Sequence, residues 1–219
     1  MAMTLLWNLF EWAGTLSFAV SGAIVGMRKQ MDLFGIAVLA IVTAVGGGIL
    51  RDVLAGQAPP RAFREPAAFL GALAVGVLLA FYLHRNRMTG RRKRILSLLY
   101  AAADTVGLAS FTVTGAMVGL GGIAPDSFVY PVVLGLVTAV GGGVLRDLMA
   151  QRVPAVFVTD VYATASLAGA VALCVVWRAG YAPAAPWVAV GVIAVLRCLA
   201  IRYRWQLFRP TGRRERGDR

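Results

Sequence analysis

The segment "TAVGGGILRDVLAG" (43–56) and its near copy "TAVGGGVLRDLMAQ" (138–151) decide the fold. Each places three consecutive glycines inside an apolar stretch and follows them with an Arg-Asp pair. Glycine in a helix costs about 1 kcal/mol relative to alanine, so three in succession predict local unwinding or a sharp kink. The same sequence of features, found twice in one chain, indicates a duplicated unit.

The similarity extends beyond these two motifs. At the offset of 95 residues that relates them, Glu65 also matches Asp160. The preceding segments match at an offset of 93, with "EWAGTLSFAVSGAIVG" (11–26) over "DTVGLASFTVTGAMVG" (104–119). An ordered series of this length predicts two copies of one structural unit.

Composition places both copies in a membrane. The 219 residues are 59% hydrophobic and 15% charged, whereas soluble domains average about 25% charged residues. A spanning helix needs roughly 20 mostly apolar residues. The expected fold is therefore an all-α integral membrane protein with seven transmembrane helices. Their predicted positions are about 8–27, 33–55, 66–84, 98–120, 128–150, 159–178 and 186–203.

Three spans fall in each copy and the seventh is left over. We predict repeat one over 8–84, repeat two over 98–178 and the seventh helix over 186–203, in a single membrane domain over 1–203. Residues 204–219 form a basic tail. Because three is odd, the second copy must enter the membrane from the opposite side, which makes the two copies an inverted repeat.

The distribution of charge gives the same result independently. The net charge is +12, and most of the 22 basic residues lie in "HRNRMTGRRKR" (84–94) and from Arg202 onward. Short basic segments beside spans stay on the cytoplasmic side. We therefore predict an outside N-terminus and a cytoplasmic C-terminus. Charge placed in this way gives no reason to expect a nucleic-acid partner.

The glycines lie in the second and fifth helices, and they allow two interpretations. Irregular backbone inside a bilayer must face protein or water, so carbonyls freed at a break can line a path for cations. Alternatively, the glycines only let helices pack closely. The duplication favours a path, and the packing interpretation stays open. The candidate glycines are Gly46, Gly47, Gly48, Gly141, Gly142 and Gly143.

The charged pairs Arg51–Asp52 and Arg146–Asp147 need partners. Adjacent residues do not face each other on one helix, so each side chain is expected to bond a freed carbonyl, the opposite repeat or a neighbouring helix. Charges at membrane depth usually face the bundle interior or a water-filled cavity. The alternative is that they snorkel to the interfaces. In either case they mark the two mouths, or a gate, of one path.

Polar residues of the neighbouring spans complete the candidate site. Hydroxyl groups either line the path or bond between helices, and both interpretations stay open. Glu11 and Asp104 start the first and fourth helices, where a carboxylate is favourable in itself, and as a pair they also concentrate cations at the mouths. The hydroxyl candidates are Thr43 and Thr138, one turn before the glycines, and Ser17 with Ser21 and Ser110 with Thr114, spaced i, i+4.

The predicted inverted repeat carries two GGGxxRD motifs, and each is preceded by TAV and by a GxxxG helix. In these features the sequence resembles the bacterial members of the trimeric intracellular cation channel (TRIC) family. The resemblance covers about residues 8–203. The resemblance implies a homotrimer in a bacterial inner membrane, with one pore in each subunit. That pore passes monovalent cations, mainly potassium, and is lined by the kinked second and fifth helices. No cofactor is implied beyond the permeant ion.

Three further expectations follow from absent motifs, from the inverted repeat and from the family. The sequence contains no HExxH, GxSxG or P-loop and no clustered His or Cys, so we predict neither an enzyme nor a metal site. Inverted repeats with broken helices also build transporters, so the alternative function is a secondary transporter of a small polar solute such as an amino acid. Animal members bind a phosphoinositide near the kinks. Arg51 and Arg146 occupy comparable stretches here, and bound anionic lipid stays open.

Overall fold

The computed structural model describes residues 2–84, 90–124, 126–158, 161–203 and 205. These residues form helices and no strands. Most of the predicted basic tail and part of the basic segment 84–94 lie outside the described residues. The long helices are α1 (Ala2–Arg28), α2 (Leu33–Leu54), α4 (Ala67–His84), α5 (Gly90–Leu120), α6 (Val129–Met149), α8 (Ala163–Arg178) and α9 (Ala185–Tyr203).

These long helices correspond one by one to the seven predicted spans, with two differences. Only five of them, α1, α2, α5, α6 and α9, are long and apolar enough to cross a membrane, and α4 and α8 are shorter apolar helices. Two one-turn helices, α3 (Arg61–Arg64) and α7 (Ala155–Val158), follow α2 and α6 and were not predicted. The described residues therefore form more helices than the seven that apolar length alone predicts.

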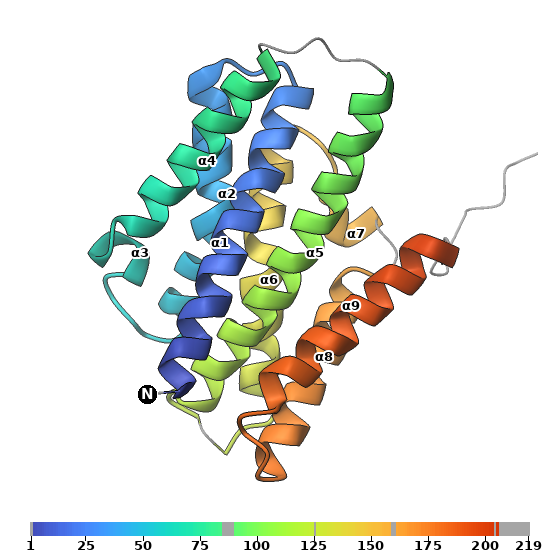
Figure 1. Ribbon diagram of the computed structural model, residues 1–219. Helices are drawn as coiled ribbons and strands as arrows, with labels where there is room; N and C mark the ends of the chain where they lie inside the picture. Colours follow the sequence, from blue (N-terminus) through green and yellow to red (C-terminus); the bar gives the residue numbers. More distant parts are fainter. Residues whose placement is uncertain (1, 85–89, 125, 159–160, 204, 206–219) are drawn as a thin grey trace, which may run out of the picture.

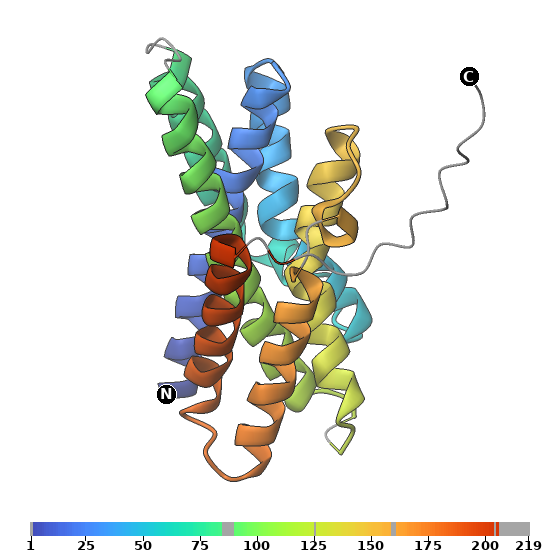
Figure 2. The same ribbon diagram turned by 90° about the vertical axis from the view of Figure 1, so that its right-hand side faces the viewer.

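The helices form two similar groups with opposite directions. α1, α2 and α4 pack together, as do α5, α6 and α8, and the groups meet where α1 contacts α5 and α2 contacts α6. α1 begins at the end of the molecule that carries the N-terminus, whereas α5 begins at the opposite end (Figure 1). α9 packs on α8 and α5 at one side (Figure 2).

The expected unwinding at the glycines is wrong. α2 and α6 run as uninterrupted α-helix through Gly46–Gly48 and Gly141–Gly143, so no backbone carbonyl is freed for a cation. The physical reason is that all six glycines are buried, where an unbonded carbonyl would cost several kcal/mol and helical hydrogen bonds are retained. A bend that keeps these hydrogen bonds stays a prediction.

The glycines instead bring α2 and α6 into backbone contact. A Cβ added to Gly47 would overlap the carbonyl oxygen of Thr138, and one added to Gly142 would overlap that of Thr43. The contacts are reciprocal, because each glycine of one helix faces the threonine that precedes the glycines of the other. Absent side chains let two helices approach closely inside a membrane, which is the packing interpretation left open above.

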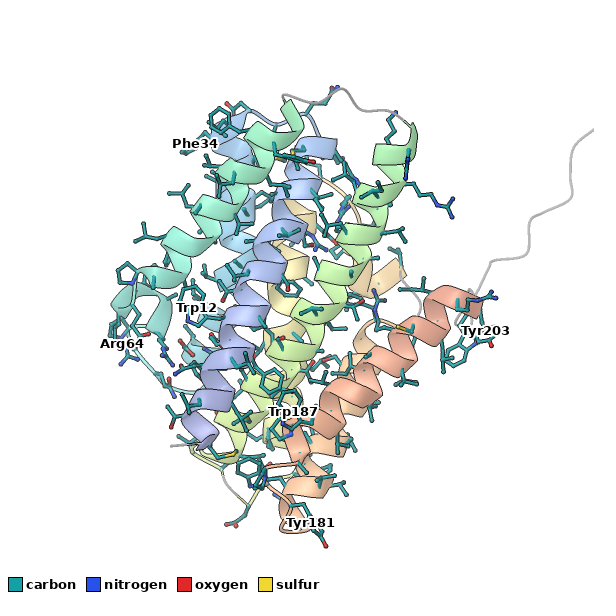
Figure 3. All side chains as sticks on the ribbon, viewed as in Figure 1. Trp12, Phe34, Arg64, Tyr181, Trp187 and Tyr203 are labelled. Carbon is teal, nitrogen blue, oxygen red and sulfur yellow. The ribbon has the colours of Figure 1, made fainter. Side chains whose placement is uncertain are left out.

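Large apolar side chains cover the outside of the molecule, including the aromatic residues labelled in Figure 3. Phe34 is 78% exposed at one end of the bundle, and Tyr181 and Trp187 are exposed at the other. Aromatic side chains at both ends of an apolar surface are typical of the membrane–water interfaces. The outer surface is therefore suited to lipid, and the polar groups of interest lie inside.

Candidate functional site

Two clusters of buried charge lie at corresponding places in the two helix groups. We call Glu11, Arg51 and Asp52 half-site one, and Asp104, Arg146 and Asp147 half-site two. Each cluster takes its acid from the first helix of a group and its Arg-Asp pair from the end of the second helix. The sequence analysis predicted all six residues for the mouths or gate, and the structure brings them together in two sets of three.

In half-site one, Glu11 and Asp52 hold the Arg51 guanidinium from two sides. Arg51 Nη1 and Nη2 donate to the two carboxylate oxygens of Glu11 at 2.9 and 3.2 Å. Its Nε donates to Asp52 Oδ1 at 2.9 Å. The Arg51 side chain is 2% exposed, whereas that of Glu11 is 22% exposed. The cluster is therefore buried but open to solvent along one edge of Glu11.

Half-site two repeats this arrangement with a shorter acid. Arg146 Nη1 donates to Asp104 Oδ1 and Nε donates to Asp147 Oδ1, both at 2.7 Å. Its three side chains are at most 2% exposed. The side chain of Asp104 is one methylene shorter than that of Glu11, and only one carboxylate oxygen of Asp104 bonds the Arg146 guanidinium. Among the described residues, Arg146 Nη2 has no hydrogen-bond partner.

The adjacent members of each pair do bond each other, which corrects the sequence analysis. The rule that neighbours in sequence face different directions holds for Cβ atoms, but the long arginine side chain bends back so that its Nε reaches the next residue. The predicted neighbouring-helix partner is also present, as Glu11 for Arg51 and Asp104 for Arg146. Neither arginine snorkels, since both are at most 1% exposed.

The second oxygen of each aspartate fixes the unpredicted short helices. Asp52 Oδ2 accepts the backbone N–H of Arg61, and Asp147 Oδ2 accepts that of Ala155, both at 2.7 Å. These N–H groups start α3 and α7, where a carboxylate satisfies a donor that has no partner within the helix. Each aspartate therefore joins the buried arginine to the segment that follows its helix.

Each arginine also contacts a hydroxyl of the other helix group. Arg51 Nη1 lies 3.4 Å from Thr114 Oγ1, and Arg146 Nη1 donates to Ser21 Oγ. Ser21 and Thr114 match at the offset of 93 residues, so the exchange is reciprocal. The two half-sites are thus linked through the region where the groups meet.

The remaining hydroxyl candidates take other roles. Thr43 and Thr138 donate to carbonyl oxygens four residues earlier, at 2.5 and 2.6 Å, and their own carbonyls form the contact with the opposite glycines. Ser17 is half-buried and Ser110 is buried, but the arginines contact Ser21 and Thr114 in their place. Thr43 and Thr138 therefore lie where α2 meets α6, and the hydrogen bonds of both hydroxyls stay within their own helices.

An aromatic ring lies beside each arginine, and the sequence analysis missed both. The Arg51 guanidinium carbon is 5.5 Å from the centre of the Trp7 ring, and that of Arg146 is 5.3 Å from the Tyr100 ring. Both distances allow a cation–π interaction. Trp7 and Tyr100 match at the same offset of 93, so extending the repeat alignment by four residues would have found them.

Arg152 distinguishes half-site two, and half-site one borders a cavity. Arg152 donates to Asp147 in half-site two, at 2.5 Å from Nη2, and also to the Tyr100 hydroxyl at 3.1 Å. Its match at the offset of 95 is Gln57. In half-site one, a cavity of about 60 Å³ lies against Glu11 and is also lined by Trp7, Thr15, Gly48, Arg51, Asp52, Arg61 and Glu65. Asp160, which matches Glu65, lies outside the described residues.

Electrostatically, the half-sites differ. In half-site one, one guanidinium faces two carboxylates, which leaves one formal negative charge. In half-site two, Arg152 also pairs with Asp147, so two guanidinium groups balance the two carboxylates. The described residues contain no group of His, Cys, Asp and Glu that suits a metal ion. The arrangement can attract and stabilise a passing monovalent cation, and it offers no nucleophile paired with a base.

Comparisons with known proteins identify relatives of this chain and of its fold. The family model described as "Glycine transporter" matches residues 8–85 and again 101–178. A UPF0126 membrane protein of Deinococcus radiodurans is 44% identical, and the match covers 72% of this chain and 70% of that protein. A UPF0126 membrane protein of Vibrio cholerae is 35% identical, and the match covers 95% of this chain and 83% of that protein. The crystal structure of the TRIC trimeric intracellular cation channel orthologue from Rhodobacter sphaeroides superimposes with a TM-score of 0.81 at 33% identity, covering 91% of this chain and 98% of that one.

Proposed function

The chain belongs to the prokaryotic trimeric intracellular cation channel (TRIC) family, and from this premise we propose that it is a monovalent cation channel. Potassium is the main permeant ion in this proposal. The functional unit is a homotrimer in which each subunit has its own pore between the two helix groups. α2 and α6, with α1 and α5, form the wall of that pore.

The observation that carries the proposal is the pairing of each buried arginine with two carboxylates. An unpaired arginine beside the path would repel cations, whereas a guanidinium held between two acids leaves a negative field. Arg51 and Arg146 are both held in this way, at corresponding places in the two groups, and in half-site two Arg152 also pairs with Asp147. Neither arginine therefore repels cations, and the net negative charge of half-site one favours cations over anions.

We propose that the barrier between the mouths lies at two buried phenyl rings and at the contact of α2 with α6. Phe18 and Phe111 are 0% and 1% exposed, and α2 and α6 touch at Gly47 and Gly142. Packed helices move by small sliding displacements, and a contact without side chains offers little resistance to such sliding. We propose that conduction requires α2 and α6 to shift at the glycine crossing so that the two phenyl rings separate.

Planar-bilayer recording of the purified protein under a KCl gradient tests this proposal. We expect unitary current steps that reverse near the potassium equilibrium potential. The double variant with Asp52→Asn and Asp147→Asn should have a reversal potential closer to zero, because both substitutions remove negative charge from the mouths. Asp32→Asn is the matched control, since the Asp32 side chain accepts the Gly35 N–H at the start of α2 and belongs to neither half-site. Reversal near the chloride potential would overturn the proposal.

A secondary transporter of a small polar solute is the alternative function. The description of the matching family model names glycine, and a closed centre with a cavity beside one half-site is also what alternating access requires. Proteoliposomes preloaded with glycine distinguish the two functions. A transporter shows saturable counterflow of labelled glycine without unitary current, whereas a channel shows current and no counterflow.

Placement and assembly form the last part of the proposal. We place the protein in the inner membrane with its N-terminus outside, because Arg28 and Lys29 then lie on the cytoplasmic side with the segment 84–94. Membrane lipids and further copies of the chain are its expected partners. Light scattering of the purified protein tests the trimer, and labelling of a single cysteine near the N-terminus in intact cells tests the orientation.

A further inference from the structure

Two buried polar atoms beside half-site two have no hydrogen-bond partner among the described residues. They are Nη2 of Arg146 and the hydroxyl of Tyr162. Both face the same point, because a Cβ added to Gly143 would lie 3.5 Å from the Tyr162 oxygen and 3.6 Å from Arg146 Nη2. Buried polar groups are normally bonded to protein, to water or to an ion, so two such groups at one point indicate a ligand.

Half-site one shows which kind of group takes the corresponding place. Gly48 matches Gly143 at the offset of 95 residues, and a Cβ added to Gly48 would lie 3.6 Å from Arg51 Nη2 and 3.7 Å from Glu11 Oε1. That carboxylate oxygen accepts a hydrogen bond from Arg51 Nη2 at 3.2 Å. No carboxylate oxygen of the described residues bonds Arg146 Nη2. The repeat therefore indicates that an anionic acceptor also belongs beside Arg146.

The two unpartnered groups and the space beside them restrict the ligand. A guanidinium only donates hydrogen bonds, and a tyrosine hydroxyl can donate one, so a ligand that bonds both as donors must be an acceptor. The distances from a Cβ on Gly143 are ordinary van der Waals contacts, so the space beside this glycine admits a body about as large as a methyl group. A water molecule and a small anion meet both conditions.

The charge around this place favours an anion over water. The two carboxylates of half-site two are already balanced by its arginine and Arg152. Arg197 of α9 adds a third guanidinium, whose carbon lies 4.9 Å from the centre of the Tyr162 ring. Arg197 is 5% exposed and pairs with no carboxylate of the described residues, and its Nε lies 3.4 Å from the Thr105 hydroxyl. A charge at membrane depth normally has a counter-charge, so one positive charge remains to be balanced.

We propose that Arg146 Nη2 and the Tyr162 hydroxyl bind one small monovalent anion of the size of chloride, beside Gly143. Both groups donate a hydrogen bond to the anion, and Arg197 supplies the remaining positive charge. Half-site one does not bind an anion in this way, because Glu11 provides the acceptor there. Binding of the anion does not require conduction, so the proposed channel and this site can fail separately.

Thermal unfolding of the purified protein in detergent tests the site. Potassium gluconate is replaced stepwise by KCl at constant potassium concentration, and gluconate is too large for the space beside Gly143. A ligand that binds only the folded protein raises the unfolding midpoint. We expect the midpoint of the wild-type protein to rise with chloride and to reach saturation. Tyr162→Phe should weaken the affinity for chloride by about tenfold, because a hydrogen bond to a charged ligand is lost.

Two glycine variants provide a matched comparison. Gly143→Ala places a methyl group beside both donors and removes neither of them, so it should abolish the effect of chloride on the midpoint. Gly48→Ala makes the same change beside Arg51 in half-site one, and the effect of chloride should remain. Arg197→Gln, which removes the third positive charge, should also weaken the binding of chloride.

The outcomes separate a bound anion from the alternatives. A saturable rise of the midpoint that Gly48→Ala keeps, and that Gly143→Ala and Tyr162→Phe abolish or weaken, supports the proposal. No saturable effect of chloride on the wild-type protein would overturn it, because water alone would then bond the two donors. Wild-type affinity for chloride in either Gly143→Ala or Tyr162→Phe would also overturn it. A larger stabilisation by glycine than by chloride would do the same and would identify a carboxylate ligand.

Discussion

Phe18 and Phe111 meet edge to face at the centre of the molecule, with 5.2 Å between ring centroids and 76° between ring planes. The two residues match at the offset of 93, and each lies against a glycine of the other's helix, Phe18 against Gly107 and Phe111 against Gly14. The rings therefore fill the space that those glycines leave open. In the proposed channel these two rings form the apolar barrier, which we call the plug.

The first prediction concerns this plug. Phe18→Ala or Phe111→Ala should raise potassium efflux from proteoliposomes, because either change removes half of the apolar barrier. The same change should lower the free energy of unfolding by about 3–5 kcal/mol, as is usual for a buried phenylalanine. Phe10→Ala is the control, since Phe10 is buried but packs on Trp187 of α9. Equal efflux from all three variants would show that the rings are not the barrier.

The second prediction separates neighbouring glycines of α2. Gly47→Ala should prevent the close contact of α2 and α6, because its methyl group would overlap the Thr138 carbonyl. Gly48→Ala should be tolerated, since the nearest atom to its methyl group is 3.6 Å away. The latter change also gains up to about 1 kcal/mol of helix propensity. Thermal unfolding in detergent should show a lower midpoint for Gly47→Ala only. Similar midpoints would mean that α2 and α6 do not depend on this contact.

The third prediction compares the two buried arginines. Arg146→Met should destabilise the protein more than Arg51→Met, because it leaves Asp104 almost inaccessible to water and without a cationic partner, while Asp147 keeps its ion pair with Arg152. Breaking a buried ion pair costs about 3–5 kcal/mol. In Arg51→Met, Glu11 keeps its exposed edge and can be hydrated. Adding Asp104→Asn to Arg146→Met should recover part of the loss. The reverse order of thermal midpoints would contradict the burial argument.

Sequence periodicity and matched motifs predicted much of this fold for a physical reason. Long apolar segments in a membrane have few alternatives to the helix, so each predicted span corresponds to one long helix. The duplicated Arg-Asp pairs and the acids Glu11 and Asp104 were found because charge inside an apolar segment requires compensation. These features depend on local composition, which a sequence displays directly.

The remaining features depend on tertiary contacts that composition does not display. Glycine propensity predicted a break in α2, but the burial of Gly47 against Thr138 preserves the helix. The short helices α3 and α7 begin where an aspartate oxygen meets a backbone N–H eight or nine residues later, and no periodicity marks that distance.

The last prediction concerns the buried hydroxyl of Tyr162, which has no hydrogen-bond partner among the described residues. It lies 3.5 Å from the position that a Cβ on Gly143 would occupy, next to the unpartnered Arg146 Nη2 at 3.6 Å. An unsatisfied buried polar group costs about 1–3 kcal/mol, so Tyr162→Phe should leave the thermal midpoint unchanged or raise it. Tyr100→Phe should lower the midpoint, because the Tyr100 hydroxyl accepts from Arg152. These midpoints are compared in gluconate buffer without chloride, and a clear loss of stability in Tyr162→Phe there would contradict this prediction. It would indicate a water molecule that bonds both the Tyr162 hydroxyl and Arg146 Nη2. Such a water would take the role that the second carboxylate oxygen of Glu11 has beside Arg51.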